Sequence, residues 1–494
     1  MMKICINFTT IVAFNRENKL QKVIFMGKRL MIHYIVCVLV ICSASCRKAK
    51  NIRAEKDEPV KTPTEEPKPS EPAKPAEPEV PQVESPSTGS FSRTYQLGTG
   101  SGNLSINGNT LTIDGNVLIK VKGGTYQSIT ISNINGIKGT VTIQNDGLVK
   151  LTSGQMRLTN LNNVIITGNG TSGLSKGFQF SDNSYRSVEV DGVLNNFTFQ
   201  YASFKNIRDN AITYKYDAAY NGSETSYSKN VKFLNIDCDN TGQFLSGAGS
   251  VEKGAIEGYI KNLEIAYLNF KNSADVGTIV WLGNVEDYNI HHNTVNNINT
   301  TNNNHNGIFL LNGNGKFHHN KVSNHQGNAI RAFCFTVGTT PKQVLIYNNI
   351  VFNSRKYSAF EVQAFEENIV SGKTTYVNAE VFNNTCGSLN LSNDWQGNLV
   401  DVYSLIGGKC KVYNNLAYNL PAPYVIAGQV SSLIPNAYNN LYFKTWSEAG
   451  ILDEVNFRLS SNSPAKGKGV ATPLLTDDFY GNARSTTPTV GAVE

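Results

Sequence analysis

Three charged residues recur at matching points of three successive repeats in the second half of the chain. Each follows an apolar residue within a short stretch of similar pattern: Arg331 in "NAIRA", Glu361 in "SAFEV" and Asp401 in "NLVDV". An arginine can neutralise a substrate carboxylate while a nearby base removes the adjacent proton. Two close carboxylates can instead act as an acid and its partner, because their repulsion keeps one protonated. An arginine flanked by acids is also a common structural charge ladder, so three interpretations stay open.

Further candidates surround these three residues. Lys356 or Arg355, from the loop after Arg331, could supply the base of an elimination reaction, so the candidate catalytic residues are Arg331, Glu361, Asp401 and Lys356. The same alignment predicts that the outward column of earlier repeats reads Thr213, Glu257, Val280 and Phe309. His305 lies in the polar run "NTTNNNHNG", and Trp281 stands at the end of a neighbouring predicted strand. We therefore expect substrate contacts from Glu257, Trp281, His305, Phe309 and Arg355.

The elements that position these residues follow from an internal repeat. "NIHHNTVNNIN" begins at Asn289 and "GKFHHNKVSNH" begins at Gly315, and "VLIYNNIVFNS" and "CKVYNNLAYNL" follow the same pattern. The apolar residue three before the shared Asn gives an anchor for each repeat, at intervals of 25 to 35 residues. These anchors are Phe199, Phe233, Ile265, Ile290, Phe317, Ile346, Val381, Val412 and Ala437, with Ile143 and Ile166 before them.

Alternating apolar residues around each anchor, followed by a break and a second apolar residue five positions later, indicate a strand, a corner and another strand. A repeat of this length cannot bury an apolar face alone, so neighbouring repeats must stack. Three short strands for each turn fit the available length. We predict an all-β fold, a single-stranded right-handed parallel β-helix with roughly 10–12 coils.

The shared Asn defines one corner of each coil. Asn tolerates tight backbone conformations, and stacked amides can hydrogen-bond from one coil to the next about 4.8 Å away. The predicted corner residues are Asn169, Asn293, Asn320, Asn349, Asn384, Asn415 and Asn440. Cys238 and Cys386 hold equivalent positions five coils apart, beyond the reach of a disulfide, so we expect free buried thiols.

A second outward column lies beside the anchors. It reads His291, His318, Tyr347, Phe382, Tyr413 and Tyr438. Stacked rings on a flat sheet can bind sugars, and they can also simply stabilise the stack, so both interpretations stay open. His291 and His318 alone make a weak metal site, because structural and catalytic sites need at least three protein ligands.

The Asn-corner repeats from about Ile143 to Lys444 resemble the pectate-lyase-like superfamily of β-helix proteins. The tail "NSPAKGKGVATPLLTDDFYGNARSTTPTVGAVE" is similar to the end of many secreted β-helix proteins. The resemblance implies a polysaccharide ligand lying along one sheet, but the superfamily includes lyases, hydrolases, esterases, epimerases and adhesins. Polygalacturonase signatures and a clear acidic calcium cluster are absent from the sequence. We therefore expect no certain cofactor and leave calcium open.

The N-terminal region predicts export. Residues 1–45 carry six basic residues against one Glu, which accounts for five of the six net positive charges, so the remainder is nearly neutral. That excludes a nucleic-acid binder. "GKRLMIHYIVCVLVICSASC" resembles a bacterial lipoprotein signal that ends before a lipidated Cys46, and residues 1–25 could be a start-site artefact. Residues 46–91 form the lipidated cysteine and a Pro-rich disordered tether, and residues 92–494 form the β-helix domain with its C-terminal tail.

The sequence thus predicts a monomeric lipoprotein of the outer membrane or cell surface of a gram-negative bacterium, anchored by lipid and directed at polysaccharide. The leading hypothesis is an enzyme of the lyase or glycoside hydrolase type that uses Arg331, Glu361 and Asp401. The alternative is a non-catalytic glycan-binding or adhesive surface protein. The sequence does not decide whether the protein is an enzyme.

Overall fold

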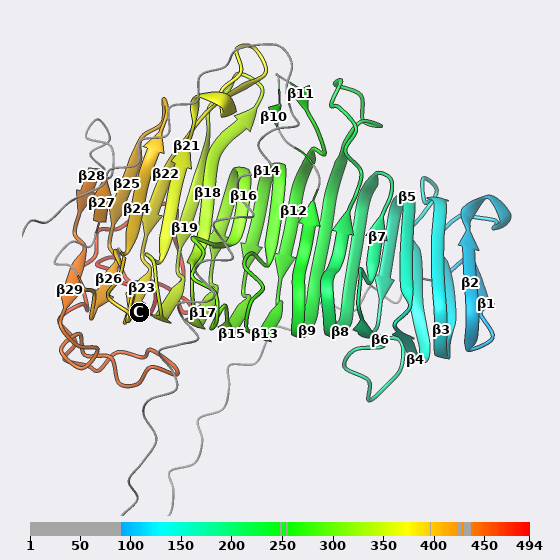
Figure 1. Ribbon diagram of the computed structural model, residues 1–494, viewed down its shortest axis with the longest axis horizontal. Helices are drawn as coiled ribbons and strands as arrows, with labels where there is room; N and C mark the ends of the chain where they lie inside the picture. The colour runs from blue at the N-terminus through cyan, green and yellow to red at the C-terminus, as the bar shows by residue number, and fades with distance from the viewer. Residues whose placement is uncertain are drawn as a thin grey trace, which may run out of the picture. The chain divides into compact units, whose positions relative to one another are not determined.

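The computed structural model describes residues 90–247, 249, 251–252, 255–395, 397–421, 426–428 and 436–494. Nearly all of its regular structure is β-strand, and most strands pair in parallel with a strand one coil away. Figure 1 shows the strands side by side in chain order, from β1 (Arg93–Leu97) at one end of the stack to β29 (Leu441–Phe443) at the other. The predicted parallel β-helix is confirmed.

The strands vary in length because several run through a bend from one face of the coil to the next. The first coils contain β2 (Ser101–Asn107), β3 (Val117–Asn135), β4 (Val141–Thr152), β5 (Gln155–Thr167), β6 (Phe178–Asn183), β7 (Val188–Val190), β8 (Leu194–Tyr214) and β9 (Ser228–Gly247). The middle coils contain β10 (Val251–Glu252), β11 (Ala255–Ile256), β12 (Ile260–Ala266), β13 (Asn269–Ser273), β14 (Val280–His291), β15 (Thr294–Ile298), β16 (Gly307–His318), β17 (Lys321–His325) and β18 (Asn328–Val337). The last coils contain β19 (Lys342–Tyr347), β20 (Ile350–Ser354), β21 (Phe360–Ala364), β22 (Thr374–Phe382), β23 (Thr385–Gly387), β24 (Val400–Leu405), β25 (Cys410–Tyr413), β26 (Leu416–Tyr418), β27 (Ile426–Gly428) and β28 (Asn436–Tyr438). Two short 3₁₀ helices, η1 (Gly108–Thr110) and η2 (Glu366–Asn368), lie in connections.

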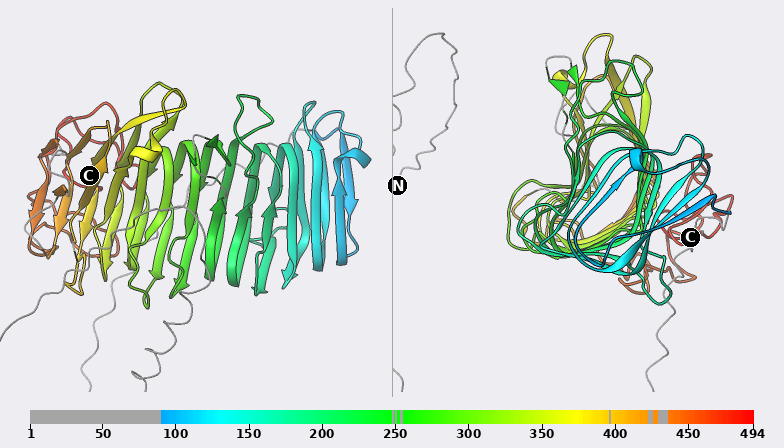
Figure 2. Two further views of the ribbon diagram at one scale, coloured as in Figure 1. Left: turned by 45° about the horizontal axis from the view of Figure 1, so that its top comes forward. Right: turned by 90° about the vertical axis from the view of Figure 1, so that its right-hand side faces the viewer.

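Each typical coil contributes a strand segment to three faces, which Figure 2 shows nearly end-on in its right-hand view. Face 1 contains the segments around Arg331 and Glu361, face 2 the segments around the anchors such as Ile290, and face 3 the segments around residues such as Val295. On face 2 the described residues form a continuous run of thirteen paired segments, from β1 to β28. The stack is therefore slightly longer than the sequence predicts.

The strand registers confirm the alignment of the repeat. Every predicted anchor is paired with the next, as in Ile290 with Phe317 and Phe317 with Ile346. The residues five positions later pair in the same way on face 3, as in Val295 with Val322. Apart from Ala437 and Tyr442 of the last coil, which are exposed, both sets point inward and form one continuous apolar core. Cys238, Cys334, Cys386 and Cys410 are free and buried, as expected for the equivalent pair Cys238 and Cys386.

The Asn ladder runs along the corner between faces 2 and 3. Nδ2 of Asn293 donates to Oδ1 of Asn320 at 2.9 Å, and the same bond recurs down the column to the last member. The left-handed backbone at this corner belongs to the preceding residue, for example His319 with φ +54° and Asn348 with φ +50°. The prediction that the ladder Asn itself takes that conformation is wrong, because its role is to hydrogen-bond between coils. Asn169 is also outside the ladder: it lies in the connection between β5 and β6, where its Oδ1 accepts from Thr167.

A ribbon of two strands rises above the bend between faces 1 and 2. The chain leaves the coil at the end of β18, and Phe335–Val337 pairs antiparallel with Thr374–Tyr376 at the start of β22. Figure 1 shows this ribbon in yellow and yellow-green above the stack, near β21. We call it the wall ribbon, because it separates the outer surfaces of the two faces.

The described part of the chain contains no helix with the length and hydropathy needed to cross a bilayer. The predicted signal, Cys46 and the Pro-rich tether lie outside the described residues. Their assignments therefore stay predictions.

Candidate active site

Arg331, Glu361 and Asp401 lie in one column on face 1. Arg331 of β18 is paired with Glu361 of β21, and Glu361 is paired with Asp401 of β24. Towards the N-terminus the same column continues through Leu310 and Trp281. The sequence therefore predicts the charged part of the column correctly, and Trp281 lies in line with it.

In the earlier part of the predicted column, Thr213 is confirmed, because it pairs with Ser246, which pairs with Trp281. Glu257, Val280 and Phe309 are wrong. Val280 pairs with Phe309 and Phe309 with Ile330, and all three side chains point into the core with 0% exposure. Ser246, which pairs with Trp281, fills the position predicted for Glu257. A slip of one residue turns a side chain to the opposite surface of a strand, and the apolar pairs in "GTIVW" and "NGIFL" conceal that slip.

Glu257 lies in the connection between β9 and β12, where it forms an antiparallel bridge with Ala219. It does not extend the charged column. Phe309 is enclosed by the coil and cannot contact a ligand on the outer surface. Neither residue belongs to the candidate site in this structure.

Glu361 is the centre of the polar cluster. Its side chain is 1% exposed, and Nε of Arg331 donates to its Oε1 at 2.8 Å. Nε2 of His305 lies 2.7 Å from its Oε2, although these two atoms are not aligned for a hydrogen bond. A buried carboxylate requires such partners, because desolvation makes an unpaired charge very costly. Arg331 and His305 are 22% and 33% exposed, so one buried group holds two nitrogen-bearing side chains that reach solvent.

The loop that carries His305 is tied to the same column. Nη1 of Arg331 donates to the His305 carbonyl at 3.3 Å. Arg355 donates to two carbonyls and one side-chain oxygen of residues 299–303, and the Tyr357 hydroxyl donates to another carbonyl of this loop at 3.0 Å. Both terminal nitrogens of Arg355 are thereby engaged. Arg355, predicted to contact substrate, holds the His305 loop in place.

Aromatic side chains border His305 on one side. Its ring stacks on Tyr357 with centroids 4.4 Å apart and planes 14° apart, and Trp395 meets Tyr357 edge-on at 5.8 Å. Lys356 is ion-paired with Asp394 at 3.0 Å, and its ammonium lies 5.6 Å from the Tyr357 ring and 5.8 Å from the Trp395 ring. Trp395 is 53% exposed, a large apolar surface beside a polar cluster.

Asp401 lies one strand beyond Glu361 and is 3% exposed. Both carboxylates of the column are therefore covered on the outer surface. Within this cluster, Arg331, His305 and the aromatic border reach solvent. Sequence reasoning placed His305 only among substrate contacts, and its position against Glu361 depends on a loop 56 residues earlier in the chain.

The aromatic column on face 2 is also present. Successive rings from His291 to Tyr438 stack with centroids 4.7 to 5.2 Å apart and planes within 17° of parallel. Leu475 of the C-terminal tail packs on Leu345, Tyr347, Phe382 and Tyr413, and these residues are buried. The covered part of the column stabilises the stack and has no surface for a sugar.

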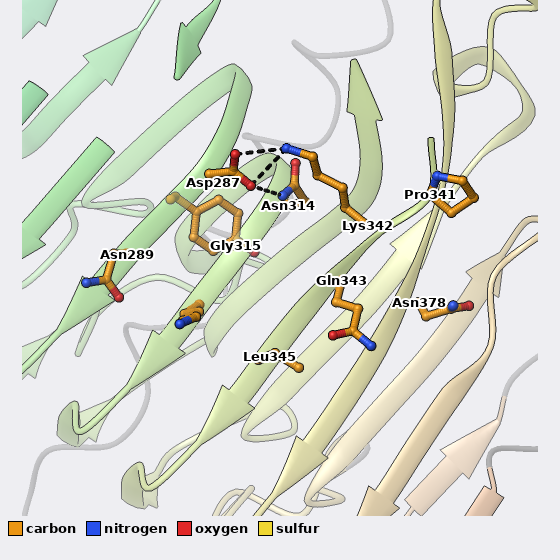
Figure 3. Close-up of a pocket in the computed structure, with 11 residues that line it drawn as sticks. Asp287, Asn289, Asn314, Gly315, Pro341, Lys342, Gln343, Leu345 and Asn378 are labelled. Atoms are coloured by element: carbon orange, nitrogen blue, oxygen red, sulfur yellow. Dashed lines mark hydrogen bonds and ion pairs between the residues drawn. The ribbon is translucent and has the colours of Figure 1, made fainter. Parts of the chain in front are cut away.

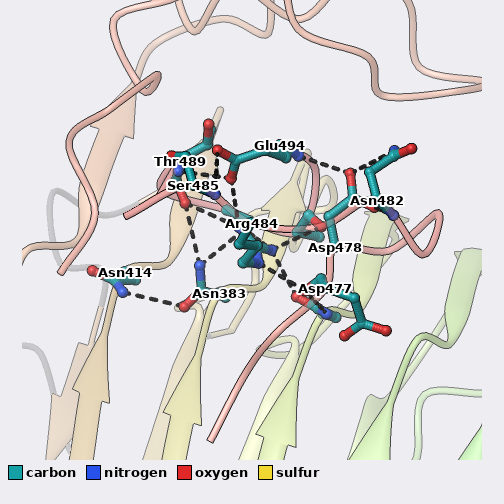
Figure 4. A network of polar contacts seen from close by, with 12 residues as sticks. Asn383, Asn414, Asp477, Asp478, Asn482, Arg484, Ser485, Thr489 and Glu494 are labelled. Carbon is teal, nitrogen blue, oxygen red and sulfur yellow. Dashed lines mark hydrogen bonds and ion pairs between the residues drawn. The ribbon is translucent and has the colours of Figure 1, made fainter. Parts of the chain in front are cut away.

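The tail is fixed by a polar network that Figure 4 shows. Arg484 is almost fully buried, and its guanidinium donates to carbonyl oxygens of the tail and to Oδ1 of Asn348 at the coil corner. Asp478 accepts from the backbone nitrogens of Tyr480, Asn482 and Glu494. Asp478, Arg484 and Glu494 thus clamp the tail onto the last coils.

The residues present do not fit a metal centre. Within the described ranges no group of three or more His, Cys, Asp or Glu side chains has an arrangement that could hold a metal ion. Calcium prefers six to eight oxygen ligands, whereas Glu361 is engaged by Arg331 and His305, and Asp394 by Lys356. His292 and His319 lie beside His291 and His318, and burial lowers the pKa of His318 far below its ordinary value and that of His292 to about 3.

Comparison with known proteins adds little to this geometry. No protein-family model matches the sequence, and no curated protein matches it. Among solved structures, pectate lyase Pel9A is 15% identical over 82% of this chain and 97% of that chain, with a TM-score of 0.32. A PL6 family polysaccharide lyase from Pseudopedobacter saltans is 10% identical over 69% and 92%, with a TM-score of 0.37, and the PL6 family alginate lyase AlyGC is 12% identical over 79% and 58%, with a TM-score of 0.35. The fold assignment rests on the strand registers, and the function has to be argued from the site.

Proposed function

We propose that the protein is a polysaccharide-active enzyme that cleaves a uronate-containing chain by elimination on face 1. The observation that carries this proposal is the pair of side chains held by buried Glu361. Arg331 offers a cation to a substrate carboxylate, and His305 offers a base a short distance away, both at the surface. A cation and a base are what elimination next to a carboxylate requires.

The proposed reaction assigns one step to each group. The His305 ring faces Glu361 through Nε2, so its Nδ1, which has no hydrogen-bond partner among the described residues, is the atom that accepts the proton. Removal of that proton from the carbon next to the carboxylate forms a carbon–carbon double bond as the glycosidic carbon–oxygen bond breaks. The departing oxygen takes a proton from water, and Arg331 stabilises the charge that develops on the carboxylate.

The aromatic border supplies a surface for the sugar ring. Trp395 exposes half of its side chain beside the cluster, and Tyr357 fixes the orientation of the His305 ring by stacking. Sugar rings pack their apolar faces on such side chains. Lys356, predicted as a base, is ion-paired with Asp394 at 3.0 Å, so we assign it to binding.

Hydrolysis by Glu361 and Asp401 is less well supported. A general acid must come within hydrogen-bond distance of the glycosidic oxygen, but these side chains are 1% and 3% exposed. A second candidate function, a glycan-binding protein without turnover, is favoured by one observation: Glu361 already neutralises Arg331 at 2.8 Å. That ion pair weakens the pull of Arg331 on the charge that develops during elimination.

One experiment separates these functions. The protein is incubated with uronate-containing polysaccharides, with calcium and with a chelator, while ultraviolet absorbance and reducing ends are recorded together. A rise in both supports elimination, because the new double bond absorbs. Reducing ends without absorbance support hydrolysis and contradict the assignment of His305. Neither signal, together with retention on an immobilised glycan, supports the binding function.

We further propose that the chain is exported and anchored through Cys46 to the outer membrane or cell surface. The basic start, short apolar run and small residues before Cys46 support this. Expression with labelled fatty acid in a gram-negative host tests it. Label that survives in the full chain but disappears in Cys46→Ala supports lipidation, and equal labelling of both proteins contradicts it.

A further inference from the structure

A cleft lies on face 2, on the opposite side of the wall ribbon from the candidate active site. It has a volume of about 710 Å³ and runs across β14, β16, β19 and β22. Figure 3 shows its polar side chains, which come from the segments that begin face 2 in four successive coils. The residues that line it are Asp287, Tyr288, Asn289, Asn314, Gly315, Lys316, Pro341, Lys342, Gln343, Leu345 and Asn378.

The cleft arises from a difference in length between neighbouring coils. In β16 a single residue separates Gly313 from Gly315, but their partners Cys334 and Val344 are separated by the whole excursion into the wall ribbon. The wall ribbon therefore stands beside the short segment around Gly315, which forms the floor of the cleft. Gly315 keeps that floor low: its φ is +154°, and a Cβ there would lie 2.2 Å from the Tyr288 carbonyl oxygen.

At the upper edge of the cleft two carboxylates, Asp287 and Glu286, are matched by two cations, Lys342 and Lys261. Lys342 binds both carboxylate oxygens of Asp287, at 3.0 and 2.8 Å, and it also contacts Glu286. Nδ2 of Asn314 donates to Asp287 at 2.9 Å, as the dashed lines in Figure 3 show. Asp287 is therefore satisfied by protein donors and does not act as an open anionic group towards a ligand.

The floor carries polar groups without full partners. Lys316 is exposed and makes no ion pair with any described residue. Gln343 is exposed and makes no hydrogen bond with the described part of the chain, and it is paired in register with Asn378, whose Oδ1 accepts from Lys409 while its Nδ2 stays available. Asn289, in register with Lys316, uses its Oδ1 with His318 and likewise has a free Nδ2.

This set of groups has a specific chemical complement. Side-chain amides donate and accept in one plane and suit the hydroxyl groups of a sugar, whereas an unpaired ammonium suits a carboxylate. The four strands span roughly 14 Å at about 4.8 Å each, long enough for more than one sugar unit. We propose that the cleft is a second binding site for an acidic polysaccharide, separate from the catalytic face, with Lys316 bound to a uronate carboxylate and Gln343 and Asn378 to hydroxyls.

The inference takes its ligand class from the proposed function, but it does not require catalysis. A chain held on face 2 stays close to face 1 across the wall ribbon, so the second site raises the local concentration of polymer at the first. A short oligosaccharide cannot occupy both sites. The second site should therefore matter for long substrates and not for short ones.

The test uses the full chain with Arg331→Ala, which slows cleavage, titrated calorimetrically with oligogalacturonate, oligomannuronate and a neutral oligosaccharide of the same length. We expect one or both acidic probes to bind, more weakly as salt is added, and the neutral probe to bind much less. Adding Lys316→Ala and Gln343→Ala should lower the affinity about tenfold or more, the loss of one charge-assisted hydrogen bond. Lys138→Ala, an exposed lysine near the other end of the stack, is the matched control and should change nothing.

Three results would overturn the inference: no binding of either acidic probe to Arg331→Ala, an unchanged affinity in the Lys316→Ala and Gln343→Ala protein, or an equal loss in Lys138→Ala. In the protein with native Arg331, Lys316→Ala should raise KM for polymer and leave kcat on a trisaccharide unchanged. Absence of turnover with the cleft still binding its probe contradicts the proposed function alone. Turnover with no binding in the cleft contradicts this inference alone.

Discussion

Face 1 carries two arginine–glutamate pairs at opposite ends of one column. Arg157 is paired in register with Glu189 near the N-terminal end, and Arg331 with Glu361 near the C-terminal end. Both glutamates are buried at 1% exposure. The two pairs thus begin from the same local arrangement, an arginine one coil before a covered carboxylate.

Their surroundings differ. Glu189 lies 2.7 Å from Lys215, 3.6 Å from Arg186 and 3.7 Å from Arg157, so cations alone surround it. Glu361 has one cation, Arg331, and one titratable base, His305, which a tethered loop brings to 2.7 Å. In the second pair aromatic side chains border the base His305, whereas near the first pair the Tyr185 ring lies against Arg186, a cation.

The difference shows how a structural charge ladder and a candidate site can be told apart. An arginine next to an acid along a sheet is not enough, because the first pair has it and offers no base. The inserted loop before β16 and the aromatic border supply what the ladder lacks. If the interpretation is right, equivalent substitutions at the two ends will have very different effects on activity and similar effects on stability.

The largest effect is expected from His305→Ala. Loss of a general base lowers kcat roughly 100- to 10,000-fold. The matched change at the other end is Lys215→Ala, which removes the closest partner of Glu189 and should leave turnover unchanged. Initial rates of double-bond formation on a polyuronate measure both. Retention of full activity in His305→Ala would remove this residue from the reaction.

Arg331→Ala should follow closely. Removing one group that stabilises developing charge costs roughly 100- to 1000-fold in kcat, and Arg157→Ala at the equivalent position should cost nothing. Arg331→Lys keeps the charge but loses the rigid donor geometry, so we expect an intermediate rate. The same absorbance assay applies, and equal rates in Arg331→Ala and Arg157→Ala would make both pairs structural.

Glu361→Gln tests a positioning residue. The amide keeps the shape but not the charge that orients Arg331 and His305, so activity should fall less than in the two variants above, and the pH profile of kcat/KM should shift. Glu189→Gln should lose a similar amount of stability, about 1–3 kcal/mol for an unsatisfied buried group, without a change in the profile. Denaturant titration measures the loss of stability in both variants, and rates recorded over a range of pH measure the shift of the kcat/KM profile. An unchanged profile in Glu361→Gln would contradict the link to His305.

The sequence predicts well those features that repeat. The anchors and the ladder from Asn293 to Asn440 recur with one residue type at one position, so alignment alone assigns their register. Arg331, Glu361 and Asp401 could be placed on one surface because each follows a single inward residue. Phe309 was misplaced because two adjacent apolar residues, Ile308 and Phe309, are both buried, which removes the alternation that sets the register.

Features that depend on excursions could not be predicted in this way. His305 reaches Glu361 through a loop held by hydrogen bonds from Arg355 and Tyr357, and no periodic pattern encodes such contacts. Glu257 does not lie in the predicted column, because its segment departs from the coil and forms antiparallel pairs. The polar run before Ile308 indicates that a loop is present, but it does not indicate towards which residues that loop folds. The cleft on face 2 likewise follows from unequal excursion lengths.

The smallest effect is expected from His292→Asn, which changes how the stability of the fold, and not the activity, depends on pH. Burial, with a smaller contribution from His319 and His291, lowers the pKa of His292 to about 3. The unfolded chain takes up this proton near pH 6.5 while the folded chain does not, so stability falls as the pH drops from about 6.5 towards 3. His292→Asn removes that proton uptake, and Asn already takes the same left-handed corner at Asn348 and Asn383, with φ +50° in both. Denaturant unfolding at pH 7 and pH 4 should show a shallower loss in His292→Asn than in the unaltered protein, and Lys138→Ala should behave like the latter. Identical losses in all three would mean that His292 does not contribute.

Rates of Arg331 and Arg157 variants are then comparable only above the pH at which these corner histidines begin to destabilise the stack.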